Sequence, residues 1–199
     1  MGRRLWFLTS NEGKLREVEH HLSPLGWDVE QMKVDDKVPE VIEPQASTLE
    51  EVAASKLQQA VEIFKVIGKN EEAVLVEDAG LFIDALSGFP GVYSAYTLNC
   101  IGCEGILRLM GDERSAHFAA VAMLWDGRNS HLGRGRCDGR IAERSTGSEG
   151  FGFDPIFIPD DMADGSSSGG LSFAALPLHV KQRFSHRGDA LDDLFSRLA

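Results

Sequence analysis

The hydrophobic periodicity of this chain changes along its length, and the change restricts the folds that the chain can adopt. Residues 3–9 form a short apolar run, and after a polar turn apolar residues recur at helical spacing over 15–22. Later, a long apolar segment at 118–125 leads into Asp126-Gly127, a strong hairpin signal, with a partner strand expected at about 129–141. Strand-helix alternation followed by a hairpin predicts an α/β protein with a mixed, twisted sheet rather than an all-parallel one.

The rest of the chain continues this alternation. Ser47, with Glu50 three residues later, matches a capping box, so we expect a long amphipathic helix from there to Phe64. The other predictions are a strand at 27–34, an irregular connection containing Pro39 and Pro44, a strand at 73–76, a Gly- and Pro-rich stretch at 80–91, a helix at about 101–110, a strand at 156–158, a flexible loop at 160–170 and a helix at about 190–198.

Length and charge limit the class of protein. A chain of 199 residues can bury one core, and we expect a single domain over residues 1–199. The 31 acidic and 20 basic residues give a net charge of -11, which argues against a nucleic-acid partner because phosphate-backbone binding needs a positive surface. No apolar run approaches the roughly 18 residues of a membrane span, and residues 1–8 lack a small-residue cleavage site. We therefore expect a cytoplasmic protein without a membrane partner.

Cysteine chemistry is not the expected function. Cys100 and Cys103 form a single C-x-x-C motif, whereas a structural zinc site needs four ligands and a redox motif needs a thioredoxin-like setting. We interpret them as ordinary thiols in or near a helix, with metal or redox chemistry as the alternative.

The first candidate for chemistry is the segment Thr9-Ser10-Asn11-Glu12-Gly13-Lys14, where a strand leads into a helix. Backbone N–H groups and the helix dipole attract phosphate at such a point, and Lys14 adds a positive charge. The segment is not a Walker A loop, because Leu8 and Leu15 occupy positions that need Gly and Ser or Thr. The alternative is a simple N-cap by Asn11 with a solvated lysine.

Two adjacent acids, Glu77-Asp78, follow an apolar strand at the place where an open α/β sheet usually positions its ligand. Adjacent carboxylates repel each other and lose hydration, so such a pair is commonly balanced by a metal ion, and oxygen ligands together with phosphates suit Mg²⁺. The alternative is that the two acids merely begin a turn before Gly80.

Two later segments are candidates for binding a base. The loop Gly150-Phe151-Gly152-Phe153-Asp154-Pro155 could stack a flat base while Asp154 accepts hydrogen bonds, and its glycines allow a close backbone approach. It could equally be a tight turn with both phenylalanines in the core. Ser185-His186-Arg187-Gly188 gathers polar side chains before a helix, with Lys181 upstream, but neighbours on one backbone rarely form a Ser-His nucleophile pair.

A serine-hydrolase motif is also present in form only. Gly165-Ser166-Ser167-Ser168-Gly169 satisfies G-x-S-x-G, yet a nucleophile elbow needs a strand before it and a helix after it. Residues 160–164 do not form a strand pattern, and the Ser/Gly tract is typical of a loop.

Taken in order, these motifs resemble the inosine/xanthosine triphosphate pyrophosphatase family, and in particular its archaeal members. The resemblance extends over nearly the whole chain. Its most specific segments are Thr9-Ser10-Asn11 with Gly13-Lys14, then 76–81, Gly88-Phe89-Pro90-Gly91-Val92-Tyr93-Ser94, 150–155 and 185–191.

The resemblance implies an elongated α/β fold of two lobes around a deep central cleft, a homodimer, and Mg²⁺-dependent hydrolysis of ITP, dITP or XTP to the monophosphate and pyrophosphate. It implies that Asp78, as proton acceptor and metal ligand, acts with Lys14 and Lys56 in catalysis. The implied metal ligands are Glu43, Glu77 and Asp78, with Glu40 as a competing alignment for Glu43. The implied substrate-binding residues are Thr9, Ser10, Asn11, Glu12, Gly13, Lys14, Lys56, Ala79, Phe151, Gly152, Phe153, Asp154, Lys181, Ser185, His186 and Arg187.

One position departs from the family pattern, because Ala175 stands where the family usually has a glutamate. Two other functions are alternatives to this pyrophosphatase activity. A nucleotide-binding regulator would release no product, and a triphosphatase acting at the γ-phosphate would release orthophosphate.

Overall fold

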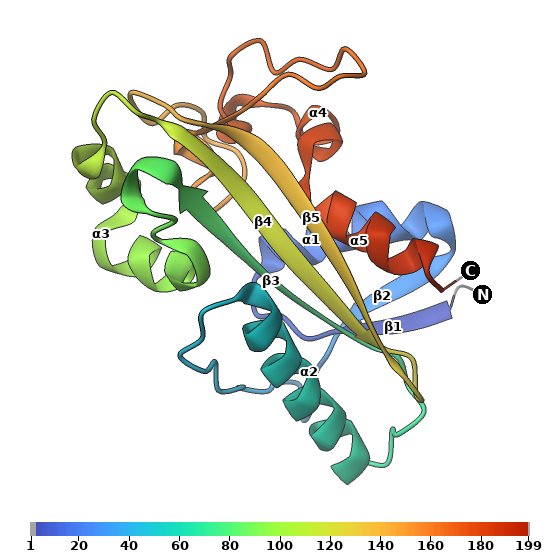
Figure 1. The fold of residues 1–199 in the computed structure, drawn as a ribbon. Helices are drawn as coiled ribbons and strands as arrows, with labels where there is room; N and C mark the ends of the chain where they lie inside the picture. The colour runs from blue at the N-terminus through green and yellow to red at the C-terminus, as the bar shows by residue number, and fades with distance from the viewer. Residues whose placement is uncertain (1–2, 199) are drawn as a thin grey trace. The chain divides into compact units, whose positions relative to one another are not determined.

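The computed structural model describes residues 3–198 (Figure 1). The helices and strands follow in the order β1 (Arg3–Phe7), α1 (Glu12–Leu22), β2 (Trp27–Gln31), α2 (Leu49–Val66), β3 (Val74–Ile83), α3 (Ser94–Leu109), β4 (Ser115–Trp125), β5 (Ser130–Ile141), β6 (Phe157–Pro159), α4 (Leu178–Lys181) and α5 (His186–Ser196).

The strands form one sheet of six in the order β2-β1-β3-β4-β5-β6. β1 pairs in parallel with both β2 and β3, whereas β5 and β6 pair antiparallel. The predicted hairpin turn joins β4 to β5, where the N–H of Asp126 donates to the carbonyl of Asn129 at 3.1 Å. The prediction of an α/β protein with a mixed sheet is confirmed.

The strand that carries the two acids is longer than predicted. β3 continues through Glu77 and Asp78 to Ile83, so neither the predicted strand end after 73–76 nor the alternative of a turn is correct. Both acids are buried. Their burial is possible because lysines from other segments of the chain supply the opposite charges.

The N-terminus of α2 lies one residue later than predicted. Thr48, not Ser47, is the N-cap: its Oγ1 accepts from the N–H of Glu51 at 3.3 Å, and the Glu51 carboxylate accepts from the N–H of Thr48 at 3.2 Å. Leu49 and Val52, three residues apart on α2, are both buried on its core face.

The helix predicted at 101–110 begins earlier, at Ser94. The Ser94 hydroxyl donates to the carbonyl of Gly91 at 2.7 Å and accepts from the N–H of Leu81 at 2.8 Å, which fixes the start of α3. Helical geometry is interrupted at Gly102, between two free cysteines on this helix, Cys100 and Cys103. The prediction of thiols in or near a helix is thus confirmed.

The chain divides into two compact units. Unit 1 comprises Met1–Asp78, Ala120–Arg134 and Asp189–Ala199, and unit 2 comprises Ala79–Ala119 and Gly135–Gly188. Within residues 3–198, no helix combines the length and the apolar character that a membrane span requires. The single domain and the elongated shape around a cleft stay predictions.

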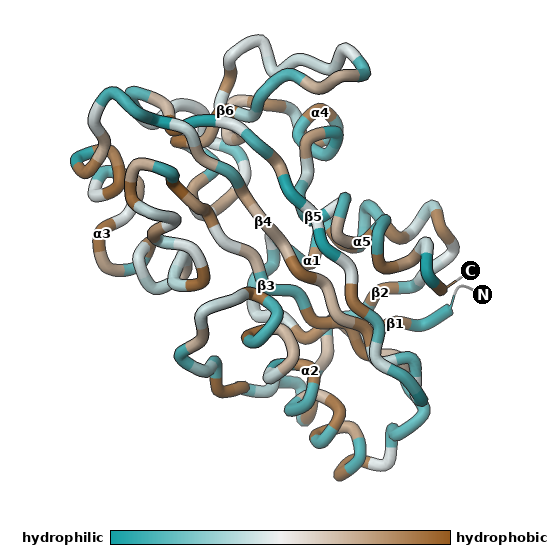
Figure 2. Tube along the Cα trace, in the orientation of Figure 1, coloured by the Kyte–Doolittle hydropathy of each residue, from teal (hydrophilic) through white to brown (hydrophobic). Residues whose placement is uncertain are grey.

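Each unit has its own core. In unit 1, Trp6 of β1 meets Phe64 of α2, with ring centroids 6.0 Å apart. In unit 2, Phe118 packs edge-on against Phe157 at 4.7 Å, and Phe173 lies beside both. Figure 2 shows the hydropathy of the two strands of the hairpin. β4 is mostly apolar, and β5 is mostly hydrophilic along its length.

The loop at 160–170 contains neither helix nor strand, as predicted. The Ser168 hydroxyl donates to the carbonyl of Pro159 at 3.2 Å, and Ser166 and Ser168 are buried. The G-x-S-x-G motif therefore lacks the strand and the helix that a nucleophile elbow requires.

Candidate phosphate and base site

The turn between β1 and α1 is organised by its own side chains. Asn11 is the N-cap of α1, and its Oδ1 accepts from the N–H of Lys14 at 3.1 Å. The hydroxyl of Thr9 accepts from the N–H of Asn11 at 3.1 Å, and Gln31 of β2 donates to the carbonyl of Thr9 at 2.8 Å. Ser10 and Glu12 are exposed and Gly13 is buried in this turn. The turn is thereby held at the N-terminus of a helix, where an anion is favoured.

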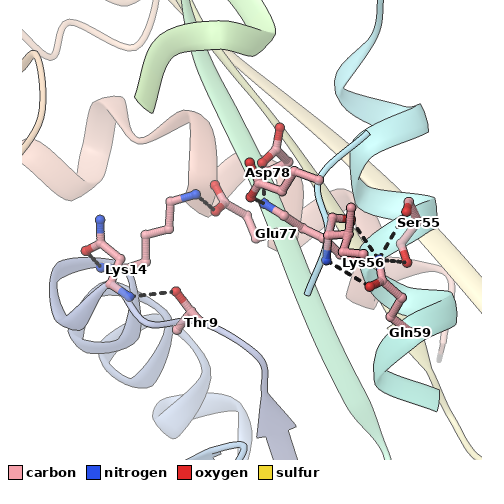
Figure 3. Close-up of polar contacts among 10 residues, drawn as sticks. Thr9, Lys14, Ser55, Lys56, Gln59, Glu77 and Asp78 are labelled. Atoms are coloured by element: carbon pink, nitrogen blue, oxygen red, sulfur yellow. Dashed lines mark hydrogen bonds and ion pairs between the residues drawn. The ribbon is translucent and has the colours of Figure 1, made fainter. Parts of the chain in front are cut away.

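Lys14 is paired rather than solvated. Its Nζ lies 2.6 Å from the Glu77 carboxylate, whose side chain is 0% exposed, while the Lys14 side chain is 17% exposed. The alternative of an N-cap with a solvated lysine is thus half correct, because Asn11 caps the helix but Lys14 turns inward (Figure 3).

The neighbouring acid serves a second lysine. The Nζ of Lys56, on α2, donates to Asp78 at 2.6 Å, and both side chains are nearly buried (Figure 3). Successive side chains of a strand alternate in direction, so Glu77 and Asp78 reach different lysines instead of repelling each other at one point.

A third carboxylate joins this group from an irregular segment. Glu43 lies 2.6 Å from Lys56 Nζ and is half exposed. Glu40, the competing alignment, makes no ion pair or hydrogen bond within the part of the chain that the structure describes. The contacts therefore favour Glu43 over Glu40.

The group as a whole has a deficit of positive charge, since three carboxylates face two ammonium groups. Burial by itself lowers the pKa of Lys56, but the charges and hydrogen bonds of Asp78 and Glu43 outweigh it and raise that pKa above its ordinary value. Burial raises the pKa of Asp78, against the opposing effects of Lys56 and Lys14, and nearby Glu77 adds to the rise. The rise for Lys56 means that a positive charge is favoured beside Asp78 and Glu43, whereas the rise for Asp78 comes first from burial.

The predicted metal ligands fit a hard cation in part. In residues 3–198 no three His, Cys, Asp or Glu side chains converge as a ready metal site. However, Glu43 and Asp78 already face one cationic atom, Lys56 Nζ, and carboxylate oxygens are the donors that Mg²⁺ prefers. These two residues fit a shared cation, whereas the contact of Glu77 is with Lys14, and its role as a ligand stays a prediction.

The candidates for base binding gather in unit 2. Lys181 Nζ lies 2.7 Å from the Asp154 carboxylate, with both side chains almost fully buried. The same carboxylate oxygen accepts from the N–H of Phe151 at 2.8 Å. Lys181 Nζ lies 5.0 Å from the centroid of the Phe151 ring, and the Arg187 guanidinium lies 5.6 Å from it. Asp154 therefore organises this loop.

The two phenylalanines of the loop have different roles. Phe153 is part of the apolar core of unit 2, as the alternative of a tight turn predicts for this residue, and its role in base binding stays a prediction. Phe151 and Gly152 are partly exposed, and Phe151 remains the candidate for stacking.

Ser185 directly precedes α5, which begins at His186. The hydroxyl of Ser185 accepts from the N–H of Gly188 at 3.1 Å, and the His186 ring stacks on Phe118 with centroids 4.7 Å apart. His186 and Arg187 are buried. Ala175 lies in a short turn where its N–H donates to the carbonyl of Ser172, and nothing in the structure explains its departure from the family pattern.

The structure thus brings the phosphate candidates together within unit 1 and the base candidates together within unit 2. Ala79 follows Asp78 in β3 and is assigned to unit 2. Sequence reasoning missed Gln31, which donates to the carbonyl of Thr9 in the phosphate turn. It also missed Gln59, which accepts from the N–H of Ile42. A polar residue one helical turn from Lys56 was the available signal for Gln59.

The model of the Ham1 family matches residues 5–197. The chain belongs to the Ham1 family. Among relatives in this family, the dITP/XTP pyrophosphatase of Thermococcus kodakarensis is 46% identical over 193 residues, covering 94% of this chain and 93% of its own. That of Pyrococcus horikoshii is 40% identical over 199 residues, covering 98% and 96%.

Solved structures of Ham1 proteins share the fold. The Coxiella burnetii HAM1 protein has a TM-score of 0.77 at 28% identity, covering 100% of this chain and 98% of its own. The Staphylococcus aureus Ham1 protein has a TM-score of 0.76 at 26% identity, covering 98% and 97%. The family resemblance expected from the motifs is confirmed.

Proposed function

We propose that this chain hydrolyses non-canonical purine nucleoside triphosphates, namely ITP, dITP and XTP, to the monophosphate and pyrophosphate. The proposal is supported by relatives named dITP/XTP pyrophosphatase that match almost the full chain. The observation that carries it is the meeting of Lys14, Lys56 and Asp78 from three distant segments in one unit.

The two lysines are the groups that bind the polyphosphate. A triphosphate brings about four negative charges, and balancing them is most of what phosphoryl chemistry asks of a protein. Lys14 and Lys56 each form an ion pair that phosphate oxygens can take over, and the N–H groups at the start of α1 add further donors.

Glu43 and Asp78 are the residues that would hold Mg²⁺, with Glu77 beside them. A bound Mg²⁺ supplies charge neutralisation at the phosphates and Lewis acidity. We propose that hydrolysis requires Mg²⁺.

Asp78 is the group that orients water and accepts its proton, for attack on the α-phosphorus with pyrophosphate leaving. Burial raises the pKa of this carboxyl above its ordinary value, which makes it a stronger base than an exposed aspartate.

The cluster in unit 2 reads the base. Arg187 and backbone N–H groups donate to a 6-oxo group, whereas the 6-amino group of adenine presents a donor to donors. Buried groups left unpaired cost roughly 1–3 kcal/mol each, enough for about ten- to hundredfold discrimination per contact.

The decisive experiment identifies the products. The purified protein is incubated separately with ITP, dITP, XTP and ATP plus Mg²⁺ in H₂¹⁸O. The products are separated, and their masses are measured by mass spectrometry. We expect pyrophosphate, ¹⁸O in the monophosphate, and poor turnover of ATP. Orthophosphate would indicate cleavage at the γ-phosphate, and binding without product would indicate a nucleotide-binding regulator.

The role of Asp78 is tested by Asp78→Asn, which keeps the size of the side chain but removes its charge. We expect turnover to fall at least a thousandfold, while the nucleotide still binds. Asp36→Asn, at an exposed turn with φ of 61°, is the matched control. Retained turnover in Asp78→Asn would refute the assigned role.

The homodimer and the cytoplasmic location are part of the same proposal. Light scattering of the purified protein measures the first, and cell fractionation the second.

A further inference from the structure

The segment that carries Glu43 has no regular secondary structure. Residues 38–46 contain no helix or strand and are mostly exposed. The bridge between Val34 and Lys37 lies before the segment, and the Thr48–Glu51 capping box lies after it. The side chain of Ile42, in the middle, is 80% exposed, so it does not anchor the segment by burial. Ordering such a segment costs backbone entropy at every residue.

One side chain of α2 holds the middle of this segment by its backbone. The N–H of Ile42 donates to Gln59 Oε1 at 2.9 Å, and Gln59 Nε2 donates to the Ile42 carbonyl at 2.8 Å. The amide orientation is set by these partners, since the N–H needs an acceptor and the carbonyl needs a donor. Gln59 Nε2 also lies 3.2 Å from both the carbonyl and the hydroxyl of Ser55, which directs the side chain along the helix (Figure 3).

This pair of hydrogen bonds fixes which residue of the segment reaches the charged cluster. Gln59 and Lys56 are three residues apart on α2 and therefore lie on one face of the helix. Ile42 is held by Gln59, and the next residue, Glu43, reaches Lys56. Glu40 lies three residues earlier, about 10 Å along an extended chain, beyond the reach of the same point.

We propose that Gln59 is a positioning residue that fixes segment 38–46 in register, so that Glu43, and not Glu40, faces the cation site. This inference rests on the proposed function for the cation, but its structural part concerns only the contact between Gln59 and Ile42.

The structural part is tested by hydrogen exchange in the full-length protein without nucleotide or metal. Gln59→Ala removes both hydrogen bonds, and the Ile42 amide should then exchange at least about tenfold faster. Gln58→Ala is the matched control, because Gln58 is the exposed neighbour on the same helix. Equal exchange of the Ile42 amide in Gln59→Ala and Gln58→Ala would overturn the inference.

The functional part is tested by Mn²⁺ binding to the free protein, measured by electron paramagnetic resonance. We expect Gln59→Ala to weaken Mn²⁺ binding about tenfold, the equivalent of about 1.4 kcal/mol. Glu43→Ala should weaken it at least as much, and Glu40→Ala should leave it unchanged. Adding Gln59→Ala to Glu43→Ala should have almost no further effect, because Gln59 acts through Glu43.

The outcomes separate this inference from the proposed function. Additive effects of Gln59→Ala and Glu43→Ala, or a loss of Mn²⁺ binding in Glu40→Ala, would overturn the positioning role. If the wild type binds no Mn²⁺ but still hydrolyses ITP, the metal part of the proposed function fails, and with it the cation side of the inference. If Mn²⁺ binds with the expected pattern but no nucleotide is hydrolysed, the proposed function fails and the inference stands.

Discussion

Replacing Asp154 by Asn removes one charge of a buried ion pair without changing the size of the side chain. Asp154 and Lys181 lie 2.7 Å apart with side chains 6% and 7% exposed. At an effective dielectric constant of about 20, their attraction is roughly 6 kcal/mol, and desolvation offsets much of it. Removing one partner leaves the other charge buried, so Asp154→Asn should lower the free energy of unfolding by about 3–5 kcal/mol.

Urea denaturation followed by circular dichroism measures this loss, and the melting temperature should fall by roughly 10 °C for a chain of this size. Asp161→Asn, at an exposed position of the neighbouring loop, is the control. The double variant Asp154→Asn/Lys181→Met carries neither charge and should be more stable than Asp154→Asn alone. A loss below about 1 kcal/mol, or a double variant less stable than the single one, would refute the reasoning.

Two further predictions concern other parts of the fold. A Cβ at Gly80 would clash with the carbonyl of Gly91, so Gly80→Ala should lower the free energy of unfolding by about 3 kcal/mol, while Gly111→Ala, in open space, should not; equal urea midpoints would contradict this. The pKa of Asp126 is lowered to about 2, mainly by the N–H of Asn129 and then by His131. Because the folded pKa is depressed, this stabilisation is present above pH 4 and is lost as the pH falls toward 2. Asp126→Asn should therefore cost about 1 kcal/mol at pH 7, allowing for solvent screening, and the cost should shrink below pH 4; a cost independent of pH would argue against it.

Features encoded by neighbouring residues were predictable from the sequence. Asn11 as N-cap and the Asp126-Gly127 turn both depend on contacts within four residues, and both are found. The capping box lies one residue later than the sequence pattern predicts, because Ser47–Glu50 and Thr48–Glu51 satisfy the same local rule. Only the hydrogen bonds between Thr48 and Glu51 in the folded chain decide between them.

Features that depend on residues far apart in the sequence were not predictable in this way. Glu77 and Asp78 mark a strand end by local criteria, yet β3 passes through them because Lys14 and Lys56 arrive from other segments. Likewise, nothing near Phe153 shows that its ring fills the core of unit 2.

The pairing of Lys14 and Lys56 with carboxylates has a consequence for how ligands enter. Under the proposed function, a polyphosphate that takes over both ammonium groups leaves Glu77, Asp78 and Glu43 without their counter-charges, and a bound divalent ion would restore the balance. Nucleotide and ion would then raise each other's affinity by one common factor, since thermodynamic linkage is reciprocal. We therefore expect free nucleotide, in a solution stripped of divalent ions, to compete poorly with the metal-nucleotide complex.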